Sequence, residues 1–260
     1  MSPWLIAIFV FVAYKYIKSK RPQAFAGTST WFKPENYAVI LNVGSVVCGV
    51  WYLTTFNSVG RFACVAASAA ASLYIVFTNY GLPRLSRQSI RAPLQEWFSK
   101  CMSGMEFPFL FFTLMFVNEH GSLLPFGLAN YVSVLLIVRR AVWFLGATWS
   151  KAPSPLWLKL GHSLWLGIKS RESFILHACS VLEVLMGFWY VFLVVTPNRQ
   201  LMTMFVYWTY LRIRYMAPRS RSSHLAAWTT IGAWVAPVRR AVPLLEKPIE
   251  WGVAWFNQGV

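Results

Sequence analysis

The sequence contains no aspartate, and its only acidic residues are eight glutamates, against 24 lysines and arginines. The missing aspartate excludes the Ser-His-Asp triad, Walker-B magnesium sites, EF-hand loops and aspartyl-phosphate pumps. Charged residues of both signs are scarce, at 12% of the chain, whereas soluble domains have about 25%. The four cysteines form no CxxC pair, and no His spacing matches a metal site. We therefore expect a protein that is not an enzyme, with no metal and no cofactor beyond bound phospholipids.

Apolar side chains are what the sequence has in excess. They make up 57% of its 260 residues, and the mean hydropathy is +0.49. A soluble chain of this size could not bury so much apolar surface, so we predict an all-α, polytopic integral membrane protein. We expect about seven transmembrane helices, some short or re-entrant, together with interfacial amphipathic helices. The expected spans are Pro3–Ile17, Tyr37–Asn57, Phe62–Leu82, Met102–Asn118, Pro125–Phe144, Phe174–Val195 and Leu201–Met216.

The basic residues sort to one side of this arrangement. If the N-terminus is outside and the spans alternate, every Lys and Arg except Arg61 and Arg199 lies on the inner side. The positive-inside rule explains this pattern, so the net charge of +16 does not indicate nucleic-acid binding. The rule does not distinguish cytosol from mitochondrial matrix. The predicted domains are a signal-anchor helix at 1–21, a helical membrane domain at 22–217 and a basic amphipathic tail at 218–260.

Two inner segments carry apolar residues at helical spacing. One, in residues 150–171, predicts a helix lying on the inner leaflet, and its stripe consists of Trp157, Leu160, Leu164 and Ile168. The second predicts a membrane-surface helix in the tail, with packing on a neighbouring subunit as the alternative, and its stripe consists of Leu225, Trp228, Ile231 and Val235. Anionic lipid headgroups are expected to contact Arg84, Arg87, Arg91, Lys159, Lys169, Arg171, Arg219, Arg221, Arg239 and Arg240.

Residues 62–74 (FACVAASAAASLY) are rich in Ala and Ser. They contain small residues four positions apart, such as Ser68 and Ser72. Helices in lipid associate through close backbone contact, which small residues permit. We therefore expect this segment to pack against other helices of the same chain.

Two acidic residues lie inside apolar runs. Glu183 lies nine residues into its span, and Glu106 lies near the inner end of another. An ionisable group at membrane depth is costly and needs a function or a partner. For Glu183 we favour a buried charge pair or a protonated acid hydrogen-bonded across helices, with Arg139 or Arg140 as the candidate partner. A proton relay with Ser180 is the alternative. For Glu106 we expect snorkelling or a pair with Lys100.

Two stretches of the chain are similar to a known family. Residues 93–118 end in Phe116-Val117-Asn118. Residues 172–195 contain Glu183, and residues 205–228 contain the junction Leu211-Arg212-Ile213-Arg214-Tyr215, followed by a Ser/Arg run. Over about residues 37–240 the chain resembles the transmembrane protein 33 family, which includes the yeast pore-membrane protein of that kind. The predicted anchor Pro3–Ile17 lies outside the family pattern.

This resemblance implies a non-enzymatic integral protein of the endoplasmic reticulum and nuclear envelope. It implies association with reticulons, membrane bending, a role in nuclear pore distribution and a C-terminal amphipathic helix that binds curved membrane. The expected partners are the bilayer, its anionic phospholipids and other membrane proteins, either reticulon-like or subunits of a large complex. One alternative is a supernumerary structural subunit of a respiratory or ATP-synthase complex in the mitochondrial inner membrane. The other is a transporter or channel.

Overall fold

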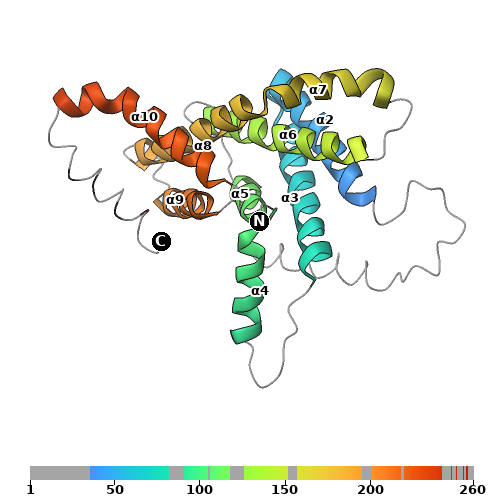
Figure 1. Ribbon diagram of the computed structural model, residues 1–260, viewed down its shortest axis with the longest axis horizontal. Helices are drawn as coiled ribbons and strands as arrows, with labels where there is room; N and C mark the ends of the chain where they lie inside the picture. Colours follow the sequence, from blue (N-terminus) through green and yellow to red (C-terminus); the bar gives the residue numbers. More distant parts are fainter. Residues whose placement is uncertain are drawn as a thin grey trace, which may run out of the picture.

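A computed structural model describes residues 36–81, 91–104, 106–117, 126–151, 157–194, 201–217 and 220–241, and the single residues 247, 250, 254 and 256. These residues are almost entirely helical (Figure 1). The predicted anchor Pro3–Ile17 lies outside them. The helices, labelled as in Figure 1, are α2 (Tyr37–Thr55), α3 (Ser58–Tyr80), α4 (Arg91–Ser103), α5 (Glu106–Val117), α6 (Phe126–Lys151), the π-helical turn η4 (Trp157–Gly161), α7 (His162–Ser170), α8 (Glu172–Val194), α9 (Leu201–Met216) and α10 (Arg221–Ala241).

Helices α2 and α3 form a hairpin closed by two residues. Phe56 ends α2 in the left-handed region, with φ of 56°, and its N–H donates to the oxygen of Tyr52 at 2.7 Å. Asn57 then caps α3, because its side-chain oxygen accepts the N–H of Val59 at 2.8 Å. Both helix ends are therefore satisfied locally, and the two helices run antiparallel and in contact.

Small residues bring α3 close to its neighbours, as the sequence predicts. Ser45 of α2 donates to the main-chain oxygen of Cys64 at 3.2 Å, and Ser68 and Ser72 are fully buried. At Gly49 of α2 an added Cβ would collide with the Val138 side chain of α6. The packing surface therefore joins α2, α3 and α6 within the chain.

Helices α8, α9 and α10 form a second group, and α5 lies between this group and the first (Figure 1). In the second group, Trp208 of α9 donates its indole N–H to the oxygen of Gly187 in α8 at 3.1 Å. The contact between α5 and α9 includes the rings of Phe112 and Tyr210, whose centroids lie 5.2 Å apart. Aromatic side chains thus join α5 to the second group, and α5 also packs against α3 of the first group.

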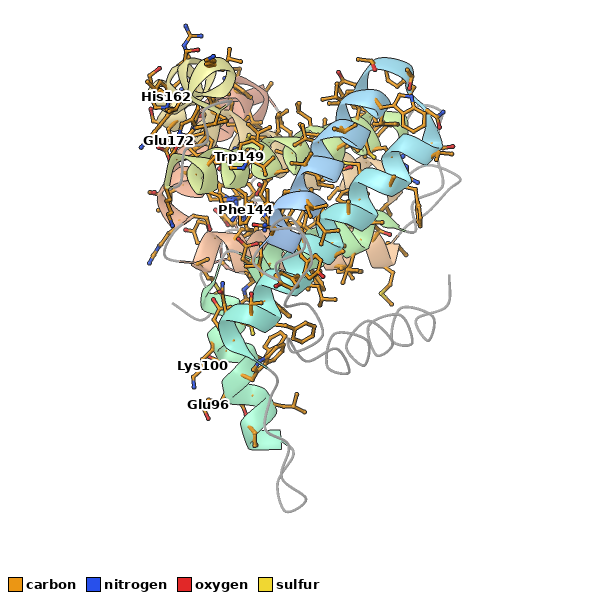
Figure 2. All side chains as sticks on the ribbon, turned by 90° about the vertical axis from the view of Figure 1, so that its right-hand side faces the viewer. Glu96, Lys100, Phe144, Trp149, His162 and Glu172 are labelled. Atoms are coloured by element: carbon orange, nitrogen blue, oxygen red, sulfur yellow. The ribbon has the colours of Figure 1, made fainter. Side chains whose placement is uncertain are left out.

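Tryptophan pairs attach the segment η4–α7 to the second half of α6. Trp143 meets Trp165 at a centroid distance of 5.0 Å, and Trp149 meets Trp157 at 5.1 Å. At Gly146 an added Cβ would collide with the Trp165 ring, so the glycine allows the close approach. Figure 2 shows Trp149 and His162 on these neighbouring segments.

Helix α4 extends away from the other helices, with Glu96 and Lys100 on its outlying part (Figures 1 and 2). Trp97 donates its indole N–H to the oxygen of Gly81, 2.9 Å away, which fixes α4 beside the end of α3. The predicted span Met102–Asn118 is therefore wrong at its start, because Met102 belongs to α4. Helix α4 ends at Ser103, next to Gly104, where an added Cβ would collide with the Tyr80 hydroxyl.

Four of the described helices are long and apolar enough to cross a membrane: Tyr37–Thr55, Ser58–Tyr80, Gly127–Lys151 and Glu172–Val194. The prediction of about seven spans is not confirmed. Of the remaining apolar segments, α5 has only 12 residues and α9 has 16. These four long apolar helices make the chain an integral membrane protein. The two shorter apolar helices, α5 and α9, pack against the longer ones.

Candidate functional site

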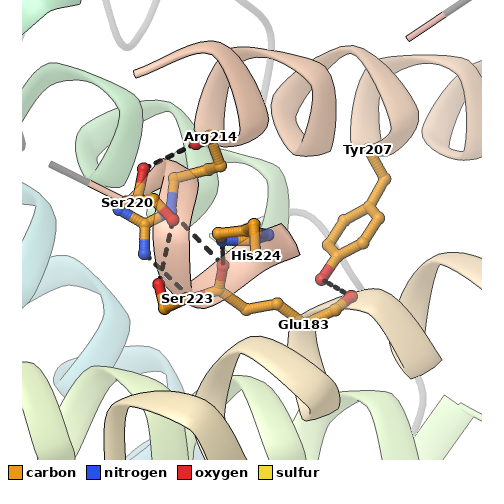
Figure 3. A network of polar contacts seen from close by, with 6 residues as sticks. All are labelled: Glu183, Tyr207, Arg214, Ser220, Ser223 and His224. Atoms are coloured by element: carbon orange, nitrogen blue, oxygen red, sulfur yellow. Dashed lines mark hydrogen bonds and ion pairs between the residues drawn. The ribbon is translucent and has the colours of Figure 1, made fainter. Parts of the chain in front are cut away.

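Glu183 of α8 lies at the junction of α8, α9 and α10 and is buried. The guanidinium of Arg214 in α9 approaches both carboxylate oxygens, with Nε 3.3 Å from Oε2 and Nη2 3.4 Å from Oε1. Nε2 of His224 in α10 lies 3.2 Å from Oε2, and the His224 side chain is fully buried. Figure 3 shows these three side chains meeting. One carboxylate therefore holds three helices together.

Hydrogen bonds to the main chain surround this ion pair (Figure 3). The Tyr207 hydroxyl donates to the main-chain oxygen of Glu183 at 2.9 Å. Ser220, before α10, donates to the main-chain oxygen of Arg214 at 2.6 Å, which fixes the turn that places His224. With a guanidinium and an imidazole on the carboxylate, the geometry favours a charge pair over a proton relay.

The predicted partner of Glu183 was wrong, because neither Arg139 nor Arg140 pairs with it. The partner is Arg214, which belongs to the family junction Leu211-Arg212-Ile213-Arg214-Tyr215. Within this junction, Leu211 is buried against Gly187, and the Tyr215 ring meets Phe256 at 5.6 Å. The sequence did contain the signal: Glu183 lies 11 residues before the end of α8, and Arg214 lies 13 residues after the start of α9. In an antiparallel pair these positions lie at similar depth.

Glu106 pairs with Arg140 of α6, so the expected pair with Lys100 is also wrong. The Arg140 guanidinium stacks on the Phe109 ring, 4.2 Å from its centroid. Lys100 instead contacts Glu96 one turn away on α4, at 2.6 Å, and lowers the pKa of that exposed carboxyl. This pair therefore favours the folded chain above the ordinary glutamate pKa, and its contribution is lost as the pH falls through the lowered value.

The apolar stripe of the tail lies in α10 but mostly faces the chain itself. Ile231 is buried, Val235 packs against the core and Trp228 meets Phe188 of α8 at 5.9 Å. Leu225, the first residue of the stripe, is instead 41% exposed. A further link to α8 is the contact of Thr230 with Nε2 of His177 at 3.2 Å. The sequence predicted that this stripe would face either the membrane or a neighbouring subunit. In the described part of α10 it packs mainly against α8 of the same chain.

The segment 157–171 also differs from its predicted stripe. The buried residue is Trp165, which the prediction missed, whereas Leu164 is 69% exposed and Ile168 is half-buried. Trp157 packs on Trp149, and the Leu160 side chain lies outside the described residues. The sequence signal for the burial of Trp165 was Gly146, because a glycine leaves room on α6 for a large ring.

The predicted headgroup residues are exposed wherever their side chains are described, namely at Lys159, Lys169, Arg171, Arg221 and Arg240. Arg84, Arg87 and Arg219 lie outside the described residues, as do the side chains of Arg91 and Arg239. Within the described part of the chain, no three His, Cys, Asp or Glu side chains are grouped so that they could hold a metal ion. The headgroup contacts themselves stay a prediction.

Comparison with known proteins identifies one family. The family model described as Transmembrane protein 33/Nucleoporin POM33 matches residues 20–228. The comparisons with curated proteins and with solved structures found no match. The family match confirms the resemblance seen in the sequence. It starts after the predicted anchor Pro3–Ile17 and ends within α10.

Proposed function

Because the chain belongs to the transmembrane protein 33/nucleoporin POM33 family, we propose that it is a non-enzymatic membrane scaffold that shapes the endoplasmic reticulum and nuclear envelope. The family match supports the class of protein and the nuclear envelope link. Neither the match nor a contact within the described residues favours a mitochondrial complex subunit or a transporter, so we propose neither.

The length of α9 carries the proposal. Its 16 residues rise about 24 Å, whereas the hydrocarbon core of a bilayer is about 30 Å thick. Its apolar side chains are exposed on the outside of the fold, with Met202 at 78% and Phe205 at 60%. Lipid that covers these side chains must thin locally, whereas lipid beside the 23 residues of α8 need not. This uneven thickness deforms the surrounding bilayer.

The second support is the amphipathic surface on the predicted inner side. Leu164 in α7 and Trp234 in α10 are 69% and 59% exposed, and Lys169, Arg171 and Arg240 are exposed near them in sequence. Apolar side chains beside basic ones are typical of helices that lie in the headgroup region of anionic leaflets. Insertion into one leaflet alone would expand that leaflet and bend the membrane.

Partners other than lipid follow from the family resemblance. Other membrane-shaping proteins, reticulon-like in kind, are the expected neighbours in the bilayer. Exposed apolar side chains along α2, such as Val47 at 64% and Val50 at 48%, provide a face that either lipid or a partner helix can cover.

The test is reconstitution of the full chain into large vesicles that contain anionic lipid, with vesicle shape measured by electron microscopy. We expect tubes or small vesicles with the natural chain. The double substitution Leu164→Glu, Trp234→Glu should abolish the deformation, because both changes place charge where we expect lipid.

The matched control is the double substitution Ser163→Glu, Thr229→Glu. Both residues are exposed on the same two helices, and the change adds the same charge. It should leave vesicle deformation intact. Vesicles that keep their shape with the natural chain would contradict the proposed function, and equal losses in both variants would contradict the role of the two apolar side chains.

A further inference from the structure

Arg139 and Arg140 are consecutive residues of α6 that have different neighbours. Arg140 pairs with Glu106 of α5 and stacks on Phe109. Arg139 lies over the ring of Trp143 on its own helix, 5.1 Å from its centroid. The two guanidinium groups therefore differ in their contacts, because Arg140 joins α5 to α6 and Arg139 stays on α6.

Among the residues that the structure describes, Arg140 has a carboxylate partner and Arg139 has none. No carboxylate of the described residues lies within 4.0 Å of Arg139, whereas Arg140 and Arg214 each have a glutamate partner. The Nε–H of Arg139 is shielded from solvent and meets no hydrogen-bond acceptor within the described chain. An uncompensated guanidinium among apolar helices is unfavourable, so an anion from outside the chain is expected to balance it.

The position of Arg139 along α6 indicates where this anion comes from. With 26 residues, α6 is about 39 Å long and exceeds the hydrocarbon core by about 9 Å. The predicted topology puts the end of α6, near Trp149 and Lys151, on the inner side together with η4–α7, on which it packs, so we place the excess length there. Arg139 lies 12 residues, or about 18 Å, before Lys151 and hence about 9 Å from the inner headgroup boundary. An extended Arg side chain covers most of this distance.

We propose that Arg139 binds the phosphate of an anionic phospholipid of the inner leaflet beside α6, next to Trp143. A guanidinium matches phosphate oxygens with two parallel N–H donors, and stacking on Trp143 holds its plane in place. This inference goes beyond membrane shaping, because it assigns one lipid to one site. It rests on the proposed function only in placing the chain in a bilayer.

The first measurement compares the full chain in neutral detergent with added phosphatidylserine, phosphatidylcholine or inorganic phosphate. Native mass spectrometry should show retained phosphatidylserine, and the melting temperature should rise with that lipid alone. An equal rise with inorganic phosphate would overturn the lipid assignment in favour of a soluble anion. Equal retention of phosphatidylcholine would overturn the recognition of an anionic headgroup.

The variants test the residue. Arg139→Gln should weaken phosphatidylserine retention about tenfold, because charge-assisted hydrogen bonds are lost. Lys100→Gln removes the same charge from an exposed position on the outlying helix α4 and should retain the lipid like the natural chain. Arg139→Lys keeps the charge but loses the paired donors, so this variant should bind phosphatidylserine several-fold more weakly than the natural chain. If Arg139→Gln does not fold, Arg139→Lys tests the site in its place.

Retention by the Arg139 variants equal to that of the natural chain would overturn the site. This failure is distinct from failure of the proposed function, because lipid retention is read from the purified chain and membrane shaping from vesicles. A chain that retains phosphatidylserine and leaves vesicles unchanged would support the site and contradict the scaffold role.

Discussion

Arg61 of α3 donates from Nη1 to the main-chain oxygen of Phe116 at the end of α5, at 3.0 Å. The same nitrogen lies 3.3 Å from the side-chain oxygen of Asn130 in α6. Ten residues away on both helices, Glu106 of α5 pairs with Arg140 of α6. Ten helical residues rise about 15 Å, so the two polar contacts connect antiparallel helices at matching heights.

We expect Arg61→Met to lower the free energy of unfolding by about 1–3 kcal/mol, because the Phe116 oxygen and the Asn130 amide lose a buried donor. Titration with sodium dodecyl sulfate in mixed micelles measures this change. Lys159→Met, which removes an exposed charge, is the control and should change stability little. Equal stabilities of the two variants would contradict the role of Arg61.

The ion pair of Glu183 and Arg214 gives a double-mutant cycle. Glu183→Gln leaves Arg214 buried without its carboxylate and should cost about 3 kcal/mol or more. Adding Arg214→Gln should then cost much less than it does in the natural chain, because the partner is already absent. Unfolding of the four variants under one condition gives the coupling energy, and strictly additive losses would show that the pair contributes nothing. Glu96→Gln, on exposed α4, serves as the control.

Two glycines of α2 should respond in opposite ways to the same substitution. Gly49→Ala places a methyl group against Val138 of α6 and should cost about 1–3 kcal/mol through overpacking. Gly44→Ala meets open space and should cause no loss. Thermal unfolding of both variants checks this, and a stable Gly49→Ala chain would indicate that α2 and α6 can separate at little cost.

The predicted topology can be checked with single cysteines at exposed positions. Phe56→Cys lies in the turn between α2 and α3, on the predicted outer side, and Lys159→Cys lies on the predicted inner side. In sealed microsomes a membrane-impermeant maleimide should label Lys159→Cys and reach Phe56→Cys only after permeabilisation. The natural chain gives the background from its own four cysteines. Labelling of both sites in intact microsomes would rule out this arrangement.

Composition and periodicity sufficed to predict a helical membrane protein, because apolar runs and basic residues report directly on the solvent around each segment. The bounds of α9, Leu201–Met216, agree with the prediction. Pair contacts between distant residues were only partly predictable. Antiparallel spans would place Glu183 and Arg214, 31 residues apart, at similar depth, but which faces of α8 and α9 meet depends on their packing.

Which face of an amphipathic helix meets lipid was the other question that the sequence left open. The α10 stripe is apolar whether it faces a membrane or α8, and the burial of Ile231 in the core appears only in the structure. The close approach of Gly104 to the Tyr80 hydroxyl at the end of α3 was similarly hidden, because it is a contact between segments far apart in the sequence.

The matched contacts at the two ends of α5 also bear on where in the cell the chain can reside. A span that is free to tilt adjusts to bilayers of different thickness, but α5 is bonded to α3 at its Phe116 end and to α6 at its Glu106 end, which removes that freedom. Bilayers of the secretory pathway thicken from about 27 Å in the endoplasmic reticulum to about 32 Å at the plasma membrane. We therefore expect forward transport to become steadily less favourable for this chain, so that membrane thickness itself acts as a retention signal.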